Sequence, residues 1–332
     1  MITMKNMKKK IELPLVEPLY STYHYQGACT AILITNPSIC NWYLNEVMML
    51  TCTSKFLKGF TSPEINIANS SWSDSPCFYK KSYNMQFLEG YTNFVIKKLL
   101  DEGYYVYFCG IDDYYVEGKS WYHKCHFDHD GCICGYDQET KTYCFYAYDQ
   151  NWIYRKFWSS QKSFEAGRKA LFRKGHYGSI CGLKPKEDQI AFSHEIALKK
   201  IEEYLELNTE IHPENDIVSG IVVHDYIAKY VGKLYDESIP YEKMDRRVFR
   251  MIWEHKKVMG KRIKLIEAAL SLDHSISDAY GWVIREADNC RMLYASHHMK
   301  PRNSILPIIQ KKLLSLKDKE KTLLEKLIEK SK

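Results

Sequence analysis

The chain has 332 residues, of which 45% are hydrophobic and 27% are charged, and its net charge is +6. This is an ordinary globular composition, with enough chain to bury a core in one large or two medium domains. No apolar run is long enough to cross a bilayer, and the N-terminal MITMKNMKKKIELPLVEP lacks the apolar stretch of a signal peptide. We therefore expect a cytoplasmic protein with no membrane partner.

The positive charge does not indicate a nucleic-acid partner. Lysines cluster at both ends, but the C-terminal run LLSLKDKEKTLLEKLIEKSK mixes both signs, which is typical of a solvated helix face. The eleven cysteines include no CxxC pair and follow no secretion signal, so we expect mostly reduced thiols packed as small hydrophobic residues. Cysteine number alone therefore indicates neither disulfides nor catalysis.

The first part of the chain alternates short apolar segments with turn residues. Its pattern predicts a short buried helix over 28–37 that starts at or just before Cys29, a helical stretch over 38–51, and a helix that stops at Gly103. Strands are predicted over 104–111, 130–137, 140–149 and 175–185. The turn YDQET joins two of these strands into an antiparallel hairpin, so we expect an α+β domain.

Beyond about residue 190, long helical periods dominate the sequence. We predict helices over about 193–207, 216–235, 241–270, 277–297 and 305–328. Short connections between them imply an antiparallel α-helical bundle. We therefore divide the chain into a catalytic domain, residues 1–188, and a helical bundle domain, residues 189–332.

Cys29 has a setting that no other cysteine shares. In YHYQGACTAIL a glycine that permits a tight turn precedes it, and a helix-like apolar run follows it. A helix N-terminus lowers a thiol pKa, and its free N–H groups can bind an oxyanion. Cys40 and Cys52 lie inside apparent helices, and the cysteines between 109 and 181 lie mostly in apparent strands. Cys29 is therefore the candidate nucleophile.

A thiol enzyme also needs a base and a group that orients the base. His129 begins the strand DGCICGYD, and Asp149 ends the next strand in FYAYDQN. In a hairpin the start of one strand lies beside the end of the next, so these two side chains can meet. Asn151 is the substitute for Asp149 as orienting group.

The segment HKCHFDHDGCICGYD has a second interpretation, because it concentrates histidines and cysteines of the kind that bind zinc. Cys132 and Cys134 are two residues apart and would share one face of a strand, whereas structural zinc pairs usually need a turn between ligands. No second clustered pair exists elsewhere in the sequence. We therefore expect cysteines in the strand core and no metal.

A cysteine on a helix start, then His-x5-Gly on a strand, then an aspartate at the end of the next strand resembles the papain-like fold. The matching pieces are QGACTAIL, HDGCICGYD and YAYDQN. The branch most similar to these pieces contains the bacteriocin-processing cysteine peptidases and the butirosin-biosynthesis acyltransferase domains, and the similarity covers roughly residues 15–185. The helical second half resembles amide-forming homologues of the closthioamide pathway.

This resemblance implies an acyltransferase that moves an acyl chain from a carrier-protein thioester onto Cys29 and then to an amine such as a diamine, forming an amide. The phosphopantetheine arm would belong to the carrier protein, and the enzyme itself would bind no cofactor. The peptidases have an oxyanion glutamine six positions before the cysteine, where this chain has Tyr23, so Tyr23 and Gln26 are the oxyanion candidates. Asp112 and Asp113 are candidates for binding the cationic amine.

Two other functions stay open at this point. A cysteine peptidase could use the same three residues and would hydrolyse a peptide without any added amine. A non-catalytic metal- or partner-binding protein could be built on the same fold. Covalent acylation of Cys29 distinguishes the enzymes from the binding protein, and dependence on an amine distinguishes the two enzymes.

Overall fold

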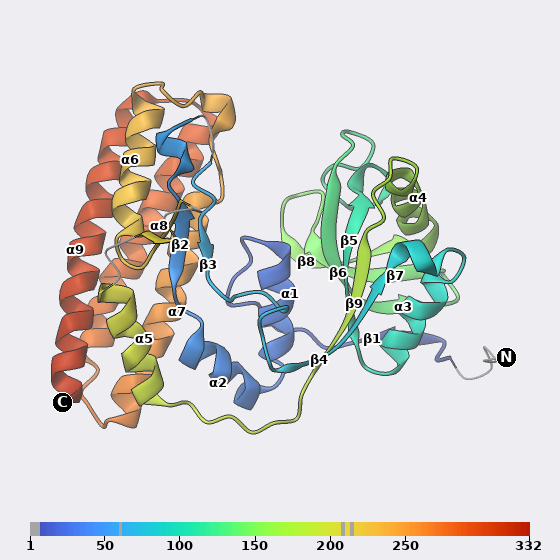
Figure 1. Ribbon diagram of the computed structural model, residues 1–332, viewed down its shortest axis with the longest axis horizontal. Coiled ribbons are helices and arrows are strands. Elements are labelled where there is room, and N and C mark those ends of the chain that lie inside the picture. Colours follow the sequence, from blue (N-terminus) through green and yellow to red (C-terminus); the bar gives the residue numbers. More distant parts are fainter. Residues whose placement is uncertain (1–6, 60–61, 207–209, 213–215) are drawn as a thin grey trace. The chain divides into compact units, whose positions relative to one another are not determined.

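The structure is a computed structural model that describes residues 7–59, 62–206, 210–212 and 216–332 (Figure 1). It is a mixed α+β protein with a large antiparallel sheet and a helical C-terminal region. The chain forms two compact units, one of Met1–Cys40 and Ser71–Gln189, the other of Asn41–Ser70 and Ile190–Lys332. A single division at residue 188 does not anticipate that residues 41–70 belong to the helical unit.

The first unit contains an antiparallel sheet in the order β4-β9-β5-β6-β7-β8, with β1 paired to β6. The strands are β1 (Lys10–Glu12), β4 (Phe78–Asn84), β5 (Tyr105–Asp112), β6 (Asp128–Asp137), β7 (Thr142–Tyr148), β8 (Tyr154–Ser160) and β9 (Ser179–Pro185). The predicted hairpin is confirmed, since β6 and β7 pair with Tyr136 opposite Tyr143.

Helices cover both faces of this sheet. On one face, α3 (Thr92–Asp101) and α4 (Gln161–Phe172) pack against a core of alternate strand residues that includes Val106, Phe108 and Ile133. The intervening residues point the other way, toward α1 (His24–Leu33), which lies against β6 and β7 (Figure 1). Two short 3₁₀ helices, η3 (Met85–Leu88) and η4 (Asp113–Tyr115), lie in connections of this unit, and η2 (Lys55–Leu57) lies in a connection of the second unit.

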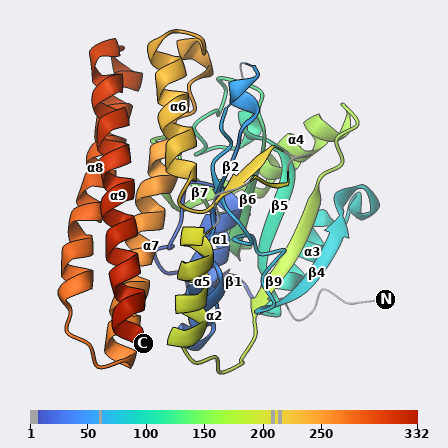
Figure 2. The same cartoon turned by 60° about the vertical axis from the view of Figure 1, so that its left-hand side comes forward.

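The second unit is built from long helices. They are α5 (His194–Glu206), α6 (Val223–Tyr235), α7 (Val248–Ala269), α8 (Ser275–Met299) and α9 (Leu306–Ser331), with η6 (Tyr241–Lys243) and η7 (Asn303–Ile305) between them. α9 packs against α6 and α8, and α8 packs against α7 (Figure 2). No helix in the described part of the chain combines the length and the apolarity needed to cross a membrane.

A small four-stranded sheet accompanies these helices and was not predicted. Its order is β10-β11-β2-β3, with β2 (Leu50–Thr53), β3 (Asn66–Ile67), β10 (Glu210–His212) and β11 (Ile217–Ser219). Cys52 is therefore a strand residue, and the helix expected from residue 216 begins only at Val223. The helical stretch expected over 38–51 is α2 (Pro37–Glu46), which ends before β2.

Candidate functional site

Cys29 does not lie at a helix start. α1 begins at His24, with Tyr23 as the residue before it, so Cys29 is the sixth residue of the helix and beyond its first turn. The favourable effect of the macrodipole is confined to that turn. The side chain has no solvent-exposed surface, and burial raises the pKa of the thiol far above its ordinary value. The structure therefore gives Cys29 the environment of an inert core thiol.

His129 forms a hydrogen-bonded pair with a carboxylate, but that carboxylate is Asp113. His129 Nδ1 lies 2.8 Å from Asp113 Oδ2, and Asp113 is almost completely buried at the start of η4. Because a carboxylate only accepts, His129 Nδ1 donates and Nε2 carries the lone pair in the neutral ring. This is the arrangement that orients a catalytic imidazole.

Asp149 has a different role from the one expected. Its Oδ1 accepts hydrogen bonds from the backbone N–H groups of Asn151 and Ile153, and its Oδ2 accepts one from Arg155 Nε at 2.5 Å. The carboxylate therefore closes the turn between β7 and β8. Hairpin register alone could not decide this, because it positions a backbone and leaves open where the side chain points.

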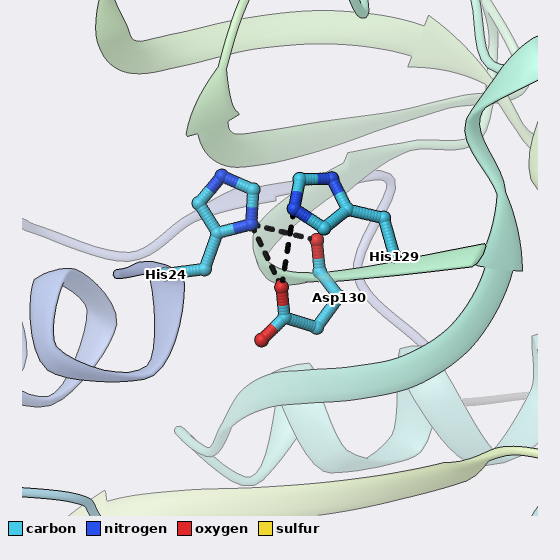
Figure 3. A group of neighbouring side chains, drawn as sticks. All are labelled: His24, His129 and Asp130. Carbon is cyan, nitrogen blue, oxygen red and sulfur yellow. Dashed lines mark hydrogen bonds and ion pairs between the residues drawn. The ribbon is translucent and has the colours of Figure 1, made fainter. Parts of the chain in front are cut away.

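The residue of α1 that faces His129 is His24. The two imidazole rings have centroids 4.4 Å apart, and His24 Nδ1 lies 2.9 Å from both the backbone oxygen and Oδ1 of Asp130 (Figure 3). His129 Nε2 lies 3.7 Å from the same carboxylate oxygen. Asp130, the residue after His129 on β6, therefore contacts both rings through one carboxylate oxygen (Figure 3).

A buried lysine offsets part of the negative charge around the two rings. Lys119 is 2% exposed, and its Nζ lies 3.3 Å from Asp113 Oδ1 and 3.3 Å from the backbone oxygen of Asp130. Burial alone would raise the pKa of Asp113, but the Lys119 ammonium and the His129 hydrogen bond outweigh it and lower that pKa. Asp113 is therefore ionised at neutral pH and can stabilise an imidazolium on His129.

His24 and Asp130 differ in charge at neutral pH. Burial lowers the pKa of His24 to about 4, so this ring is neutral. Burial would raise the pKa of Asp130, but hydrogen bonds from His24 and Tyr107 outweigh it, and the carboxyl stays ionised. Asp130 therefore adds a negative charge next to His129.

The other candidate residues are also placed by the structure. Asp112 accepts hydrogen bonds from the backbone N–H groups of Tyr114 and Phe127 and pairs with the His126 ring, and it has no exposed surface. Neither Asp112 nor Asp113 therefore presents its carboxylate to solvent, where an amine would approach.

The two oxyanion candidates lie on or beside α1. Tyr23 precedes the helix and stacks on Tyr25 with ring centroids 5.4 Å apart, and Gln26 is buried in the helix. The thiol that they were expected to serve does not lie at the helix start. Their oxyanion role stays a prediction.

A hollow of about 450 Å³ opens beside His129. It is lined by Cys109, Gly110, Asp128, His129, Asp130, His176, Tyr177 and Gly178. Its carboxylates, Asp128 and Asp130, could hold a cationic group beside His129. Cys109 is its one lining thiol, but burial and the nearby Asp130 raise its pKa to about 11, so it is a poor source of thiolate.

His24, His129 and Asp130 are the one group of three ligand-type residues close enough to share a metal ion among the residues that the structure describes. Two histidines and a carboxylate with an open position form a common catalytic zinc set, and Asp113 would orient His129 behind the metal. The ligand types and their spacing therefore fit.

The protonation of His24 does not fit a metal site as well as the ligand types do. The backbone N–H of Tyr148 lies 3.3 Å from His24 Nε2, so Nε2 accepts and Nδ1 carries the proton that it shares with Asp130. A metal bound to Nδ1 would move this proton to Nε2, where it would face a second donor, the Tyr148 N–H. The Lys119 ammonium next to Asp130 would also repel a bound cation. The residues fit a hydrogen-bonded cluster better than a metal centre.

Of this cluster, the sequence singled out His129 and Asp113 but gave Asp113 another role. His24, Lys119 and Asp130 were missed, and only the position of Asp130 beside His129 could have indicated it. Comparison of the chain with protein-family models and with curated proteins gave no significant match. The site consists of an imidazole oriented by a buried carboxylate at the edge of an acidic hollow.

Proposed function

We propose that this chain transfers an acyl group from a thioester directly to an amine, with His129 as the general base and without a covalent intermediate on Cys29. One observation carries the proposal: His129 lines the hollow and its Nδ1 is held by the buried, ionised Asp113, which leaves Nε2 as the acceptor. A histidine oriented in this way can take a proton from an attacking amine.

The acyl-donor half of the proposal is supported by the sequence resemblance to papain-like acyltransferases. In that fold a thiol on a helix start faces the catalytic histidine. Here the same place is taken by His24, whose ring lies against His129. Because an imidazole that is buried and hydrogen-bonded on both nitrogens is a poor nucleophile, a one-step transfer is favoured over an acyl-enzyme.

The proposed reaction needs no oxidant and no metal. The amine nitrogen attacks the thioester carbonyl carbon, and its proton moves to His129 Nε2 as the C–N bond forms. The C–S bond then breaks, and the leaving thiolate takes the proton from the imidazolium that Asp113 stabilises. Asp128 and Asp130 in the hollow would hold a second ammonium group of a diamine. An acidic carrier protein in the cytoplasm is the expected donor for a chain of net charge +6.

The test uses the full chain with an acyl-N-acetylcysteamine thioester and a diamine. We expect an amide product that requires the protein, intersecting initial-rate lines typical of a ternary complex, and no acyl adduct by intact mass spectrometry. His129→Gln should reduce the rate to background, whereas Cys29→Ala should retain it. An acyl adduct on the wild type that Cys29→Ala abolishes would overturn the one-step mechanism, and no amide with any thioester would favour a non-catalytic binding protein.

A further inference from the structure

A ridge of aromatic side chains leads away from His129. The Phe127 ring packs edge-on against His129 with centroids 4.9 Å apart, Trp121 lies 6.1 Å from Phe127, and Trp152 meets Trp121 edge-on at 5.5 Å. Phe127 is 42% exposed and Trp152 is 53% exposed. We call Trp121, Phe127 and Trp152 the aromatic ridge.

The backbone around the ridge is closely constrained. The Phe127 N–H donates to Asp112, and its carbonyl accepts from the Asp113 N–H, so the segment that orients His129 also fixes Phe127. An isolated antiparallel bridge between Lys119 and Asp149 joins the turn that carries Trp121 to the turn that carries Trp152. Both turns are therefore anchored beside the site.

Trp152 has a backbone φ of +60°, a conformation that costs free energy for a bulky residue. The carboxylate of Asp149 holds this conformation through the N–H groups of the two residues on either side of Trp152, and the Trp152 N–H donates to the Asp149 carbonyl. Glycine or asparagine would adopt this backbone with less strain. Folding stability alone does not explain an exposed tryptophan here.

The hollow and the ridge, which both adjoin His129, differ in chemistry. Asp128 and Asp130 line the hollow, whereas the ridge presents ring surface, and Asp149 in the turn that carries Trp152 is only 1% exposed and committed to that turn. A cationic amine would bind on the acidic side. The acyl chain would then lie on the ridge, whose Phe127 ring contacts His129.

We propose that the aromatic ridge binds the acyl group of the donor and selects aromatic acyl groups over short aliphatic ones. This inference rests on the proposed function, and it makes Trp152 a specificity residue and Asp149 a positioning residue. Flat rings suit this surface because aromatic pairs add stacking and edge-to-face attraction to the burial of apolar area.

The experiment compares benzoyl, cyclohexanecarbonyl and acetyl N-acetylcysteamine thioesters at one diamine concentration. Benzoyl and cyclohexanecarbonyl have similar size, so their ratio reports ring stacking, and acetyl reports the reaction without a ridge contact. Each kcat/KM is divided by the rate of uncatalysed aminolysis of the same thioester, because a conjugated benzoyl carbonyl is less reactive than an acetyl one. For the wild type we expect this normalised kcat/KM for benzoyl to exceed that for acetyl by about tenfold and that for cyclohexanecarbonyl by a few-fold.

Trp152→Asn should bring both ratios close to one, because asparagine keeps the left-handed backbone and removes the ring. Trp158→Leu is the matched control, since Trp158 is a similarly exposed tryptophan, 37% exposed, on β8 and outside the ridge. The control should retain the wild-type ratios. A benzoyl-to-acetyl ratio that Trp152→Asn leaves unchanged would overturn the inference.

A binding measurement separates this inference from the proposed reaction. N-propylbenzamide cannot be transferred, and its titration quenches tryptophan fluorescence where it stacks on the ridge. We expect its dissociation constant to rise about tenfold in Trp152→Asn and to stay unchanged in Trp158→Leu. If no thioester is turned over but this shift is found, the ridge inference stands and the reaction fails. Turnover without any benzoyl preference would support the reaction and overturn the ridge inference.

Discussion

His129 is oriented by Asp113 and not by Asp149. We therefore expect different outcomes when each of these aspartates is changed to asparagine. In Asp113→Asn, the Lys119 ammonium can only donate, so the amide oxygen turns toward Lys119 and the amide NH₂ faces His129. His129 Nδ1 must then accept, which places the proton on Nε2. Since a base with a protonated Nε2 cannot take a proton from the amine, we expect a rate loss on the order of 10³–10⁴-fold.

In Asp149→Asn the same change keeps most of the contacts of the turn. One amide oxygen can still accept from the backbone N–H groups of Asn151 and Ile153, as Oδ1 does in the carboxylate. Only the interaction with Arg155 is lost, and the Arg155 side chain, 53% exposed, can turn to solvent. A surface-linked ion pair of this kind contributes roughly 1 kcal/mol or less to stability. The rate should therefore stay close to that of the wild type.

The assay measures amide formation from a thioester with the amine at a saturating concentration. Circular dichroism and the thermal midpoint of unfolding are the controls for folding. Each variant replaces one carboxylate oxygen by an NH₂ group. Because the chemical change is the same, a difference between the two rates must come from the position of the residue. A rate loss in Asp149→Asn as large as that in Asp113→Asn would refute the reasoning. So would a well-folded Asp113→Asn variant with more than a tenth of wild-type activity.

Three further outcomes are expected. Burial lowers the pKa of His24 to about 4, whereas an unfolded histidine has a pKa near 6.5, so the unfolded chain binds the proton first and stability is lost as pH falls between these values; urea titrations should show about 2 kcal/mol lost from pH 7 to 5, and His24→Gln should remove most of that loss. Glu320 Oε2 lies 2.7 Å from Lys256 Nζ, and both are fully buried; Glu320→Gln should cost about 3–5 kcal/mol by urea unfolding, and pairing it with Lys256→Met should cost less than the two single changes together. Elemental analysis of the purified chain should find well under one equivalent of zinc, and a stoichiometric metal lost in His24→Gln would contradict the proton arrangement.

Local pattern was sufficient to predict the central hairpin and the C-terminal helices. The segments of β6 and β7 are rich in β-forming residues and are separated by one short turn, so the signals for both strands and for their pairing lie within 25 residues. The long helices show sustained apolar periodicity, which is the strongest signal that a single sequence offers. In each case the information that specifies the element is close to it in the chain.

The small sheet of the helical unit shows the opposite situation. Val218 pairs with Cys52, more than a hundred residues earlier in the chain. The two strands that carry these residues, β11 and β2, are three and four residues long, and both belong to segments that also suit a helix. Only the pairing stabilises them as strands, and no local pattern reports a partner at that distance. The same pairing ties residues 41–70 to the second unit, together with hydrogen bonds such as that from His255 Nε2 to the carbonyl of Met48.

The error in the predicted helix start at Cys29 has a physical cause at Gly27. A glycine two residues before Cys29 was interpreted as a turn before a helix, but Gly27 lies within α1. A Cβ at this position would come 2.5 Å from the ring of Tyr154, whose hydroxyl donates to the carbonyl of His24. Glycine is therefore required for close packing of the helix on β8 and not for a turn. The helix therefore starts five residues before Cys29, at His24, and it is the His24 ring that faces His129.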